Sequence, residues 1–197
     1  MRKFVIASSN SGKLREISHL LSPLGIEALP QDIFNVSEAD EPHCTFIENA
    51  LAKARHACVH TGLPSLADDS GICVNALNGN PGVLSARYAG EPKSDEQNNW
   101  KLVEVLRDQT DRRAHYYCVI VLMRHAEDPQ PIIAEGSWHG EIILEPRGKG
   151  GFGYDPYFFL ADVDKTAAEL PMEQKNRISH RGKALARLIE SIRQEIL

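Results

Sequence analysis

The chain has 197 residues, of which 42% are hydrophobic and 25% charged, a balance typical of one or two compact units and not of a disordered segment. Its formal net charge of -5 argues against a general nucleic-acid binder, which normally presents a basic surface. No stretch has the length of a membrane span, and the first apolar run is too short for a signal peptide. We therefore expect a cytoplasmic protein that binds neither nucleic acid nor membrane, and that holds any anionic ligand with local cations, a metal ion or backbone dipoles.

The first part of the chain alternates between strand and helix. Residues 4–7 are apolar β-formers, residues 8–12 form a polar loop, and apolar residues then recur at helical spacing through residues 14–21. Residues 45–60 predict a second helix with an apolar face. This part of the chain is therefore expected to form a strand, a polar loop and a helix, with a second helix further along.

Two short strands are expected on either side of Asp68-Asp69-Ser70-Gly71, at residues 65–67 and 72–74. A third helix is expected over residues 94–107, because Ser94-Asp95-Glu96 is a capping signal. Its core stripe would contain Trp100, Val103 and Leu106.

The second part of the chain is richer in β-formers. Two long strands are expected at residues 115–123 and 132–144, followed by an amphipathic helix from about Ser179. Alternation early and consecutive strands later predict an α/β fold with a mixed, twisted sheet flanked by helices.

The loop Ser8-Ser9-Asn10-Ser11-Gly12-Lys13 follows a strand and opens a helix, where unpaired N–H groups and the helix dipole favour a phosphate. Lys13 would add a full positive charge. The loop does not match the Walker A pattern, because Ala7 and Leu14 stand where Gly and Ser or Thr are required. A helix-capping loop with a surface lysine is the alternative interpretation.

Asp68 and Asp69 are adjacent on a strand, so their side chains should point to opposite faces and serve separate roles. One could bind Mg²⁺ or orient water while the other anchors the turn. The acidic run that ends at Glu41 could supply another metal ligand, although a solvated acidic loop is the simpler interpretation.

The loop Gly150-Gly151-Phe152-Gly153-Tyr154-Asp155-Pro156 is suited to a flat polar ring. Its glycines would let backbone N–H groups approach a ligand, Phe152 offers a stacking face, and Asp155 can accept from ring N–H donors. A turn between strands with Phe152 buried in the core is the alternative.

Two further groups of basic side chains are candidates. One group is Lys175 with His180 and Arg181, because the planar guanidinium of an arginine presents several N–H donors that suit keto oxygens or phosphates. The alternative interpretation is a helix N-cap beside exposed basic residues. His56 and His60 are four residues apart on a predicted helix, which is a metal-ligand spacing, but ordinary helix histidines are favoured because the Glu of a zincin motif is absent.

Taken together, these motifs resemble the inosine/xanthosine triphosphate pyrophosphatase family, and above all its bacterial dITP/XTP branch. The resemblance covers almost the whole chain, and six ordered motifs are far more specific than any one of them. The motifs are Ser8-x-Asn10-x-x-Lys13, Phe46-Ile47-Glu48-Asn49-Ala50, Ala67-Asp68-Asp69-Ser70-Gly71, Pro81-Gly82 with Ser85-Ala86-Arg87-Tyr88, Gly151-Phe152-Gly153-Tyr154-Asp155-Pro156 and Ser179-His180-Arg181.

The resemblance implies Mg²⁺-dependent hydrolysis of deaminated purine nucleoside triphosphates (ITP, dITP, XTP) to the monophosphate and pyrophosphate. It also implies one domain, residues 1–197, with two lobes, no separable linker and a central cleft, usually as a homodimer. The implied catalytic residues are Asp69, Asp68 and Lys13, with Asp69 and Glu41 as metal ligands. Phosphate or sugar contacts are implied for Ser8, Ser9, Asn10, Ser11, Gly12, Lys13, Lys53, Ser70 and Arg87, and base contacts for Phe152, Gly153, Tyr154, Asp155, Lys175, His180 and Arg181.

Base choice would rest on donors that meet a 6-keto oxygen. The 6-amino group of ATP would place a donor against those donors, and such an unpaired buried contact can discriminate by roughly 10⁴-fold. Two other functions remain open: a pyrophosphatase for modified pyrimidine nucleotides, as in the related septum-inhibitor class, and a nucleotide sensor without turnover. A purely structural protein is less favoured, because it would not need the glycine-rich loop.

Overall fold

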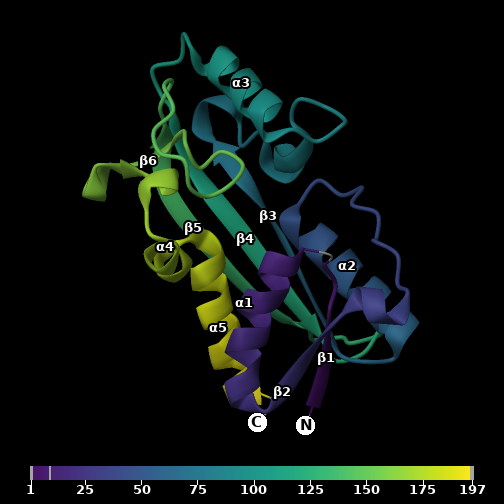
Figure 1. Ribbon diagram of the computed structural model, residues 1–197. Coiled ribbons are helices and arrows are strands. Elements are labelled where there is room, and N and C mark those ends of the chain that lie inside the picture. The colour runs from purple at the N-terminus through teal and green to yellow at the C-terminus, as the bar shows by residue number, and fades with distance from the viewer. Residues whose placement is uncertain (1, 9, 196–197) are drawn as a thin grey trace. The chain divides into compact units, whose positions relative to one another are not determined.

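The computed structural model describes residues 2–8 and 10–195. Within these residues, seven strands form one mixed sheet in the order β2-β1-β3-β4-β5-β6-β7 (Figure 1). β1 pairs in parallel with β2 and β3, whereas β6 pairs antiparallel with β5 and β7. The strands are β1 (Arg2–Ile6), β2 (Ile26–Pro30), β3 (Ser65–Val74), β4 (Arg113–Met123), β5 (Ile132–Ile142), β6 (Phe158–Leu160) and β7 (Lys165–Thr166). The α-helices are α1 (Ser11–Leu21), α2 (Phe46–Thr61), α3 (Asp95–Leu106), α4 (Met172–Ile178) and α5 (His180–Glu195).

The α/β class and the mixed sheet predicted from the sequence are confirmed. None of the helices in the described part of the chain combines the length and the apolar character that a membrane crossing needs.

The chain divides into two compact units. Unit 1 comprises Met1–Asp69, Val119–Glu135 and Ala184–Leu197, and unit 2 comprises Ser70–Cys118 and Gly136–Lys183. By their bounds, β3, β4 and β5 each supply residues to both units.

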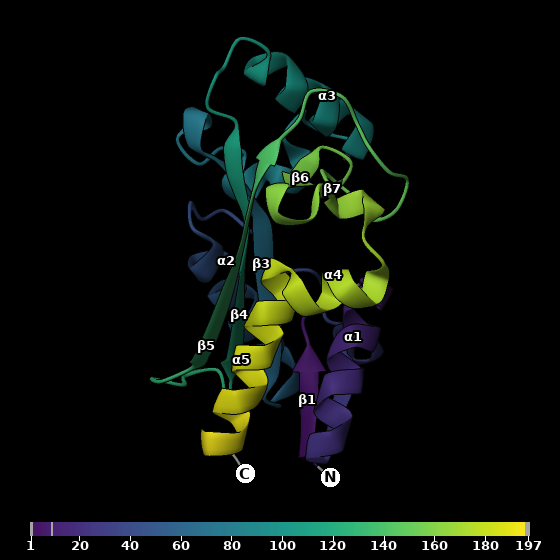
Figure 2. The same cartoon turned by 90° about the vertical axis from the view of Figure 1, so that its left-hand side faces the viewer.

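In unit 1, α1 and α5 lie on one face of the sheet and α2 lies on the other (Figures 1 and 2). The two N-terminal helices begin where capping residues satisfy their free N–H groups: Asn10 accepts from the N–H groups of Gly12 and Lys13, and Thr45 accepts from that of Glu48. The buried core contains Val5, Ile6, Ile17, Leu21, Ala50, Ala54, Leu66, Leu188 and Ile192.

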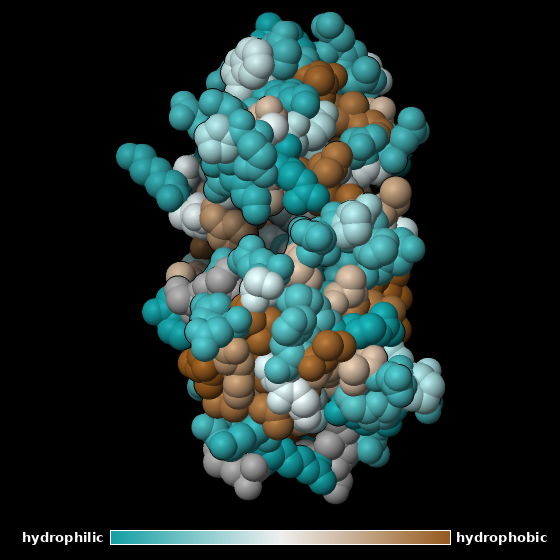
Figure 3. Space-filling model, turned by 90° about the vertical axis from the view of Figure 1, so that its right-hand side faces the viewer, coloured by the Kyte–Doolittle hydropathy of each residue, from teal (hydrophilic) through white to brown (hydrophobic). Residues whose placement is uncertain are grey.

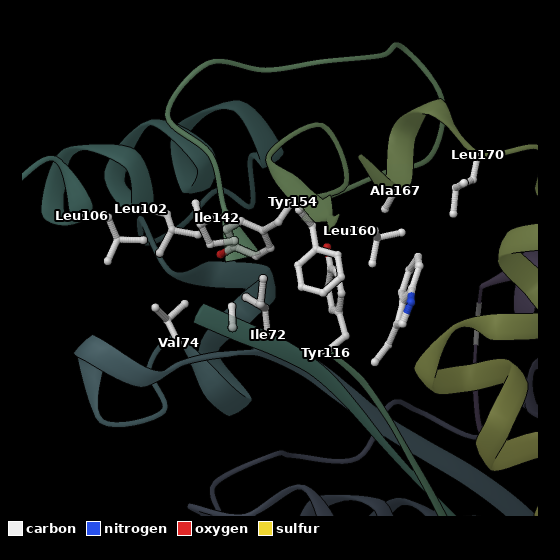
Figure 4. Packing of buried hydrophobic residues seen from close by; sticks show 13 residues of the cluster. Ile72, Val74, Leu102, Leu106, Tyr116, Ile142, Tyr154, Leu160, Ala167 and Leu170 are labelled. Atoms are coloured by element: carbon white, nitrogen blue, oxygen red, sulfur yellow. The ribbon is translucent and has the colours of Figure 1, made fainter. Parts of the chain in front are cut away.

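Unit 2 has an aromatic core. Tyr116, Trp138, Phe158 and Tyr154 pack with aliphatic side chains from β3 and α3, including Ile72 and Leu102 (Figure 4). Large apolar side chains buried in this way stabilise a fold by about 1.5–3 kcal/mol each. The glycine-rich loop is thereby attached to a packed frame through Tyr154.

Two expectations from the sequence differ from the structure. Asp68 to Gly71 form no turn, because β3 runs unbroken from Ser65 to Val74. The buried face of α3 also differs from the predicted one, which contained Trp100. Trp100 is 69% exposed, and the buried residues are Asn98, Asn99, Leu102 and Leu106. The two asparagines can face inward because their side-chain amides bond to backbone groups of Ala86, Ala89 and Gly153.

Other large hydrophobic side chains are exposed as well, among them Ile33, Val59, Leu84 and Met172. Figure 3 shows a face on which hydrophilic side chains dominate and hydrophobic ones stand among them. Single exposed hydrophobic residues are normal on soluble domains, so those on this face do not indicate a binding site.

Candidate functional site

The loop before α1 is held by its own side chains. Asn10 Oδ1 accepts from the backbone N–H groups of Gly12 at 2.9 Å and Lys13 at 3.1 Å, and Ser8 Oγ accepts from the N–H of Asn10 at 3.2 Å. The loop therefore caps the helix, and a phosphate would have to share or replace these contacts. Ser9 lies outside the described residues, and so does the side chain of Ser11.

Lys13 is paired with Asp68. Its ammonium donates to both carboxylate oxygens of Asp68, at 2.9 and 2.8 Å, and the Asp68 side chain is only 4% exposed. The lysine is thus held by an acidic residue on β3 and is not a solvated surface charge. Removing either partner would leave a charge poorly compensated in a mostly buried place.

Asp69 has a different set of partners. Its Oδ2 accepts from the amide of Asn49 at 3.3 Å, and its Oδ1 lies 3.4 Å from the ammonium of Lys53. Lys53 also donates to Glu41 at 2.6 Å, so one ammonium serves two carboxylates.

Burial raises the pKa of the Asp69 carboxyl; Lys53 opposes that shift and Glu41 adds to it. Burial acts to lower the pKa of Lys53, but Asp69 and Glu41 outweigh it and the pKa is raised. A carboxylate with a raised pKa is a better proton acceptor near neutral pH than an exposed one. Asp69 therefore has one property, a raised pKa, that suits a proton acceptor.

The two adjacent carboxylates have separate partners, as their opposite directions on β3 predict: Asp68 meets Lys13 of α1, and Asp69 meets Asn49 and Lys53 of α2. Among the described residues, no three His, Cys, Asp or Glu side chains gather closely enough to form a metal site unaided. A hard cation here would need ligands from its substrate as well.

Asp155 lies at the centre of the polar contacts of unit 2. Its side chain is buried, its Oδ2 accepts from the backbone N–H of Phe152 at 2.8 Å and from the ammonium of Lys175, and its Oδ1 accepts from the hydroxyl of Tyr116 at 3.4 Å. Both oxygens are thus occupied within the protein. For Asp155 to accept from a base, one of these donors would have to give way.

Tyr116 connects two predicted site residues. Besides its bond to Asp155, its ring is stacked on that of His180, with centroids 4.7 Å apart and planes 9° apart. Burial and the Asp155 charge raise the pKa of Tyr116 well above its ordinary value, so the phenol remains a donor.

Phe152 is the exposed part of the loop. Its side chain is 63% exposed, and the Lys175 ammonium lies 4.8 Å from the ring centroid. The predicted alternative, a Phe152 buried in the core, is wrong. An exposed ring with a cation at its face is suited to stacking on a flat polar ligand.

Side chains of α3 hold the backbone of the same loop. Gly153 donates its N–H to Asp95 at 2.7 Å, and its carbonyl accepts from Asn99 at 2.8 Å. Gly151 has φ +76°, and a Cβ at that position would lie 2.0 Å from Asp155 Oδ2. Only glycine fits there while the carboxylate keeps its place.

A family model for the Ham1 family matches residues 4–191 of the chain. The chain belongs to the Ham1 family. A protein of Nitrosomonas europaea named dITP/XTP pyrophosphatase is 71% identical over 98% of this chain and 95% of its own length; one of Ralstonia nicotianae with the same name is 61% identical over 98% of each. A solved HAM1 protein from Coxiella burnetii is 50% identical and has a TM-score of 0.96, covering 98% of this chain and 100% of that one.

The predicted residues of this Ham1 chain fall into two groups, one in each unit. In unit 1, hydrogen bonds and ion pairs join one group: Asn10, Lys13, Glu41, Lys53, Asp68 and Asp69. In unit 2, the loop and Tyr116 join the other: Phe152, Gly153, Tyr154, Asp155, Lys175 and His180. Ser70 on β3, Arg87 at the end of a short 3-10 helix and Arg181 on α5 also belong to unit 2.

Two residues that contact predicted site residues were not named as site residues from the sequence. Asn49 is buried on the apolar face of α2. A polar residue on the apolar face of a predicted helix is the feature of the sequence that could have indicated its contact with Asp69. Tyr116 gave no signal, because an aromatic residue in an apolar strand is typical of a core.

Proposed function

We propose that this protein hydrolyses deaminated purine nucleoside triphosphates, such as ITP, dITP and XTP, to the nucleoside monophosphate and pyrophosphate. The observation that carries the proposal is the arrangement on β3, where Asp68 and Asp69 each hold a different lysine and Asp69 is buried with a raised pKa. The names of its relatives give the substrate class.

The unit 1 group would handle the triphosphate. The Lys13 ammonium, now bound to Asp68, would exchange that carboxylate for phosphate oxygens, and Lys53 would add a second positive charge. Ser8, Ser9, Asn10, Ser11 and Gly12 would line the phosphate chain, and Ser70 and Arg87 are proposed to add contacts to phosphate or sugar.

The hydrolysis step would use Asp69 as base. Its carboxylate takes a proton from a water molecule while the water oxygen bonds to the α-phosphorus, and the bond from that phosphorus to the oxygen bridging to the β-phosphate breaks. Pyrophosphate leaves with the bonding electron pair. Asn49, which donates to Asp69 Oδ2, would hold the carboxylate in orientation.

Mg²⁺ is the proposed cofactor, with Asp69 and Glu41 as its protein ligands. The residues fit this ion, because both carboxylates already share one cation, the Lys53 ammonium. Mg²⁺ commonly takes one or two carboxylates and completes its shell with water and substrate phosphates, which agrees with the lack of a third acidic ligand among the described residues. When bound, it would supply charge neutralisation on the phosphates.

The unit 2 group would recognise the base. Phe152 would stack on the purine, and Lys175, His180 and Arg181 would donate to its keto oxygens. Because Asp155 is buried and its oxygens are occupied, we propose that it acts chiefly by holding Lys175 and the backbone of Phe152. Gly153 and Tyr154 would fix the loop through α3 and Ser85.

Three expectations accompany this proposal. The two units would work as one domain, which the shared strands β3, β4 and β5 support. A homodimer and a cytoplasmic location are expected from the family resemblance and from the location of nucleotide pools, respectively.

The test incubates the purified protein with Mg²⁺ and, separately, ITP, XTP, dITP, GTP and ATP, and measures nucleotide products, pyrophosphate and orthophosphate. We expect monophosphate and pyrophosphate from ITP, dITP and XTP and little product from ATP or GTP. Orthophosphate release, equal use of ATP, or binding without turnover would contradict the proposal. A modified pyrimidine nucleoside triphosphate, assayed in the same way, tests the septum-inhibitor function, which its turnover in place of the purines would support.

A further inference from the structure

A pair of histidines on α2 is not used by the proposed reaction. His56 and His60 are one helical turn apart in unit 1, and their ring centroids lie 4.2 Å apart with the planes at 46°. His60 is exposed and His56 is partly exposed, so water and dissolved ions can reach the pair. This spacing alone is common among helix histidines, and the hydrogen bonds of the two rings are what distinguish this pair.

Each ring uses one nitrogen on a backbone carbonyl. His56 Nε2 lies 3.0 Å from the carbonyl oxygen of Ser37 and 3.5 Å from the hydroxyl of the same residue, and His60 Nδ1 lies 2.8 Å from the carbonyl oxygen of His56. A carbonyl oxygen only accepts, so each of these nitrogens carries the hydrogen and donates it. In the neutral rings, His56 Nδ1 and His60 Nε2 therefore keep their lone pairs.

Each ring thus has one feature of metal-binding histidines. A ligating imidazole nearly always donates its other N–H to a carbonyl or carboxylate, which fixes the tautomer and the ring orientation and makes the ligating nitrogen more basic. Here both partners are backbone carbonyls, one from the helix itself and one from the segment before it. These hydrogen bonds already orient both rings, so binding of an ion would cost little further side-chain conformational entropy.

We propose that His56 and His60 form a two-histidine site for a divalent transition-metal ion of the Cu²⁺, Ni²⁺ or Zn²⁺ class. Imidazole nitrogen suits these ions, whereas Mg²⁺ prefers oxygen, so this site and the carboxylates of Asp69 and Glu41 select different metals. Water would complete the shell, because no third His, Cys, Asp or Glu joins the pair among the described residues.

The site lies on the same side of α2 as the acidic group. Positions 49, 53, 56 and 60 follow the helical repeat, so Asn49, Lys53, His56 and His60 form one stripe. At about 1.5 Å of rise per residue, His56 is roughly 4.5 Å along the axis from Lys53. An ion bound by the histidines would add positive charge near the Lys53 ammonium.

The test measures Ni²⁺ binding by calorimetry, and Cu²⁺ coordination by electron paramagnetic resonance, on the full chain with excess Mg²⁺ to occupy the carboxylates. We expect one Ni²⁺ site and nitrogen hyperfine structure from imidazole ligands on Cu²⁺. His60→Gln and His56→Gln should each weaken Ni²⁺ binding by at least about tenfold. Thermal unfolding of the metal-free variants shows whether His60→Gln, at an exposed position, leaves the fold intact.

Two controls separate this pair from other histidines. His19→Gln removes an exposed single histidine of α1, and His139→Gln breaks the stacked pair that His139 forms with His115 across β4 and β5. Both should keep Ni²⁺ binding unchanged. Binding that survives His60→Gln, binding lost in either control, or no binding to the wild-type protein would overturn the proposal, whatever the outcome of the nucleotide assay.

Discussion

The two groups of predicted site residues hold their carboxylates with different kinds of partner. In unit 1, Lys13 donates to both oxygens of Asp68 and Lys53 bridges Asp69 and Glu41, so ammonium groups that could also bind a phosphate hold these carboxylates. In unit 2, Asp155 is buried, its oxygens are occupied, and an aromatic core surrounds it. Under the proposed function, phosphate binding would depend on ion pairs that can exchange partners, whereas base recognition would depend on a loop that backbone and buried hydroxyl contacts hold in place.

Replacing the proposed base should have the largest effect. Asp69→Asn keeps the size and the polarity of the side chain but removes both the proton acceptor and the charge proposed to bind Mg²⁺, so at saturating Mg²⁺ we expect kcat for ITP to fall by about 10²–10⁴-fold with little change in KM. Steady-state kinetics measure kcat and KM, and a binding assay shows whether the variant still binds ITP. Loss of ITP binding with an unchanged kcat would contradict the role of Asp69.

The matched control is a second carboxylate of unit 1 that has only a structural role. Asp128 is buried and bound by Arg124 at 2.6 and 2.8 Å. Asp128→Asn should lower the free energy of unfolding at pH 7 by about 1.5–3 kcal/mol and leave kcat unchanged. Denaturant unfolding with activity measured in parallel gives both values.

The pH dependence of this control has a defined sign. The Arg124 hydrogen bonds hold the pKa of Asp128 below its ordinary value. A depressed pKa contributes stability above the unfolded pKa of about 3.9 and loses it as the pH falls through the folded value. The stability gap between wild type and Asp128→Asn should therefore narrow below about pH 4, and a constant gap would show that the pair does not act through charge.

Removing the stacking ring of unit 2 should affect binding and not chemistry. Phe152→Ala should raise KM for ITP and XTP by an amount equivalent to about 1–3 kcal/mol and change kcat little, because the ring would contact only the base. Trp100→Ala is the control, since Trp100 is a similarly exposed aromatic residue of the same unit. Equal effects of the two substitutions on KM would show that Phe152 has no special role.

The smallest effect is expected from the contact between Tyr116 and Asp155 in unit 2. Tyr116→Phe removes only the hydroxyl that donates to Asp155, and we expect KM for ITP to rise by an amount equivalent to about 0.5–1.5 kcal/mol at unchanged kcat. Tyr117→Phe, at the next position of β4, should leave KM unchanged. A fall in kcat for Tyr116→Phe would place this tyrosine in the chemical step instead.

The sequence predicted the fold class and the main helices because apolar spacing and capping residues are local signals. Thr45 and Ser94 cap α2 and α3 where the sequence places those helix starts. The unbroken β3 and the inward-facing Asn98 and Asn99 escaped prediction, because both depend on partners distant in the chain. For the same reason, the sequence named Asp155 but not Tyr116, which approaches it from 39 positions away.

Gly151 has a consequence for how the loop can vary. At φ +76° every L-residue is strained, and any Cβ would collide with the Asp155 carboxylate that holds the loop and Lys175. Saturation mutagenesis at this codon should therefore leave few tolerated replacements, although the residue would make no contact of its own with a base. The neighbouring Gly153 has φ +59° but open space around its missing Cβ, so Asn or Asp could replace it with less loss.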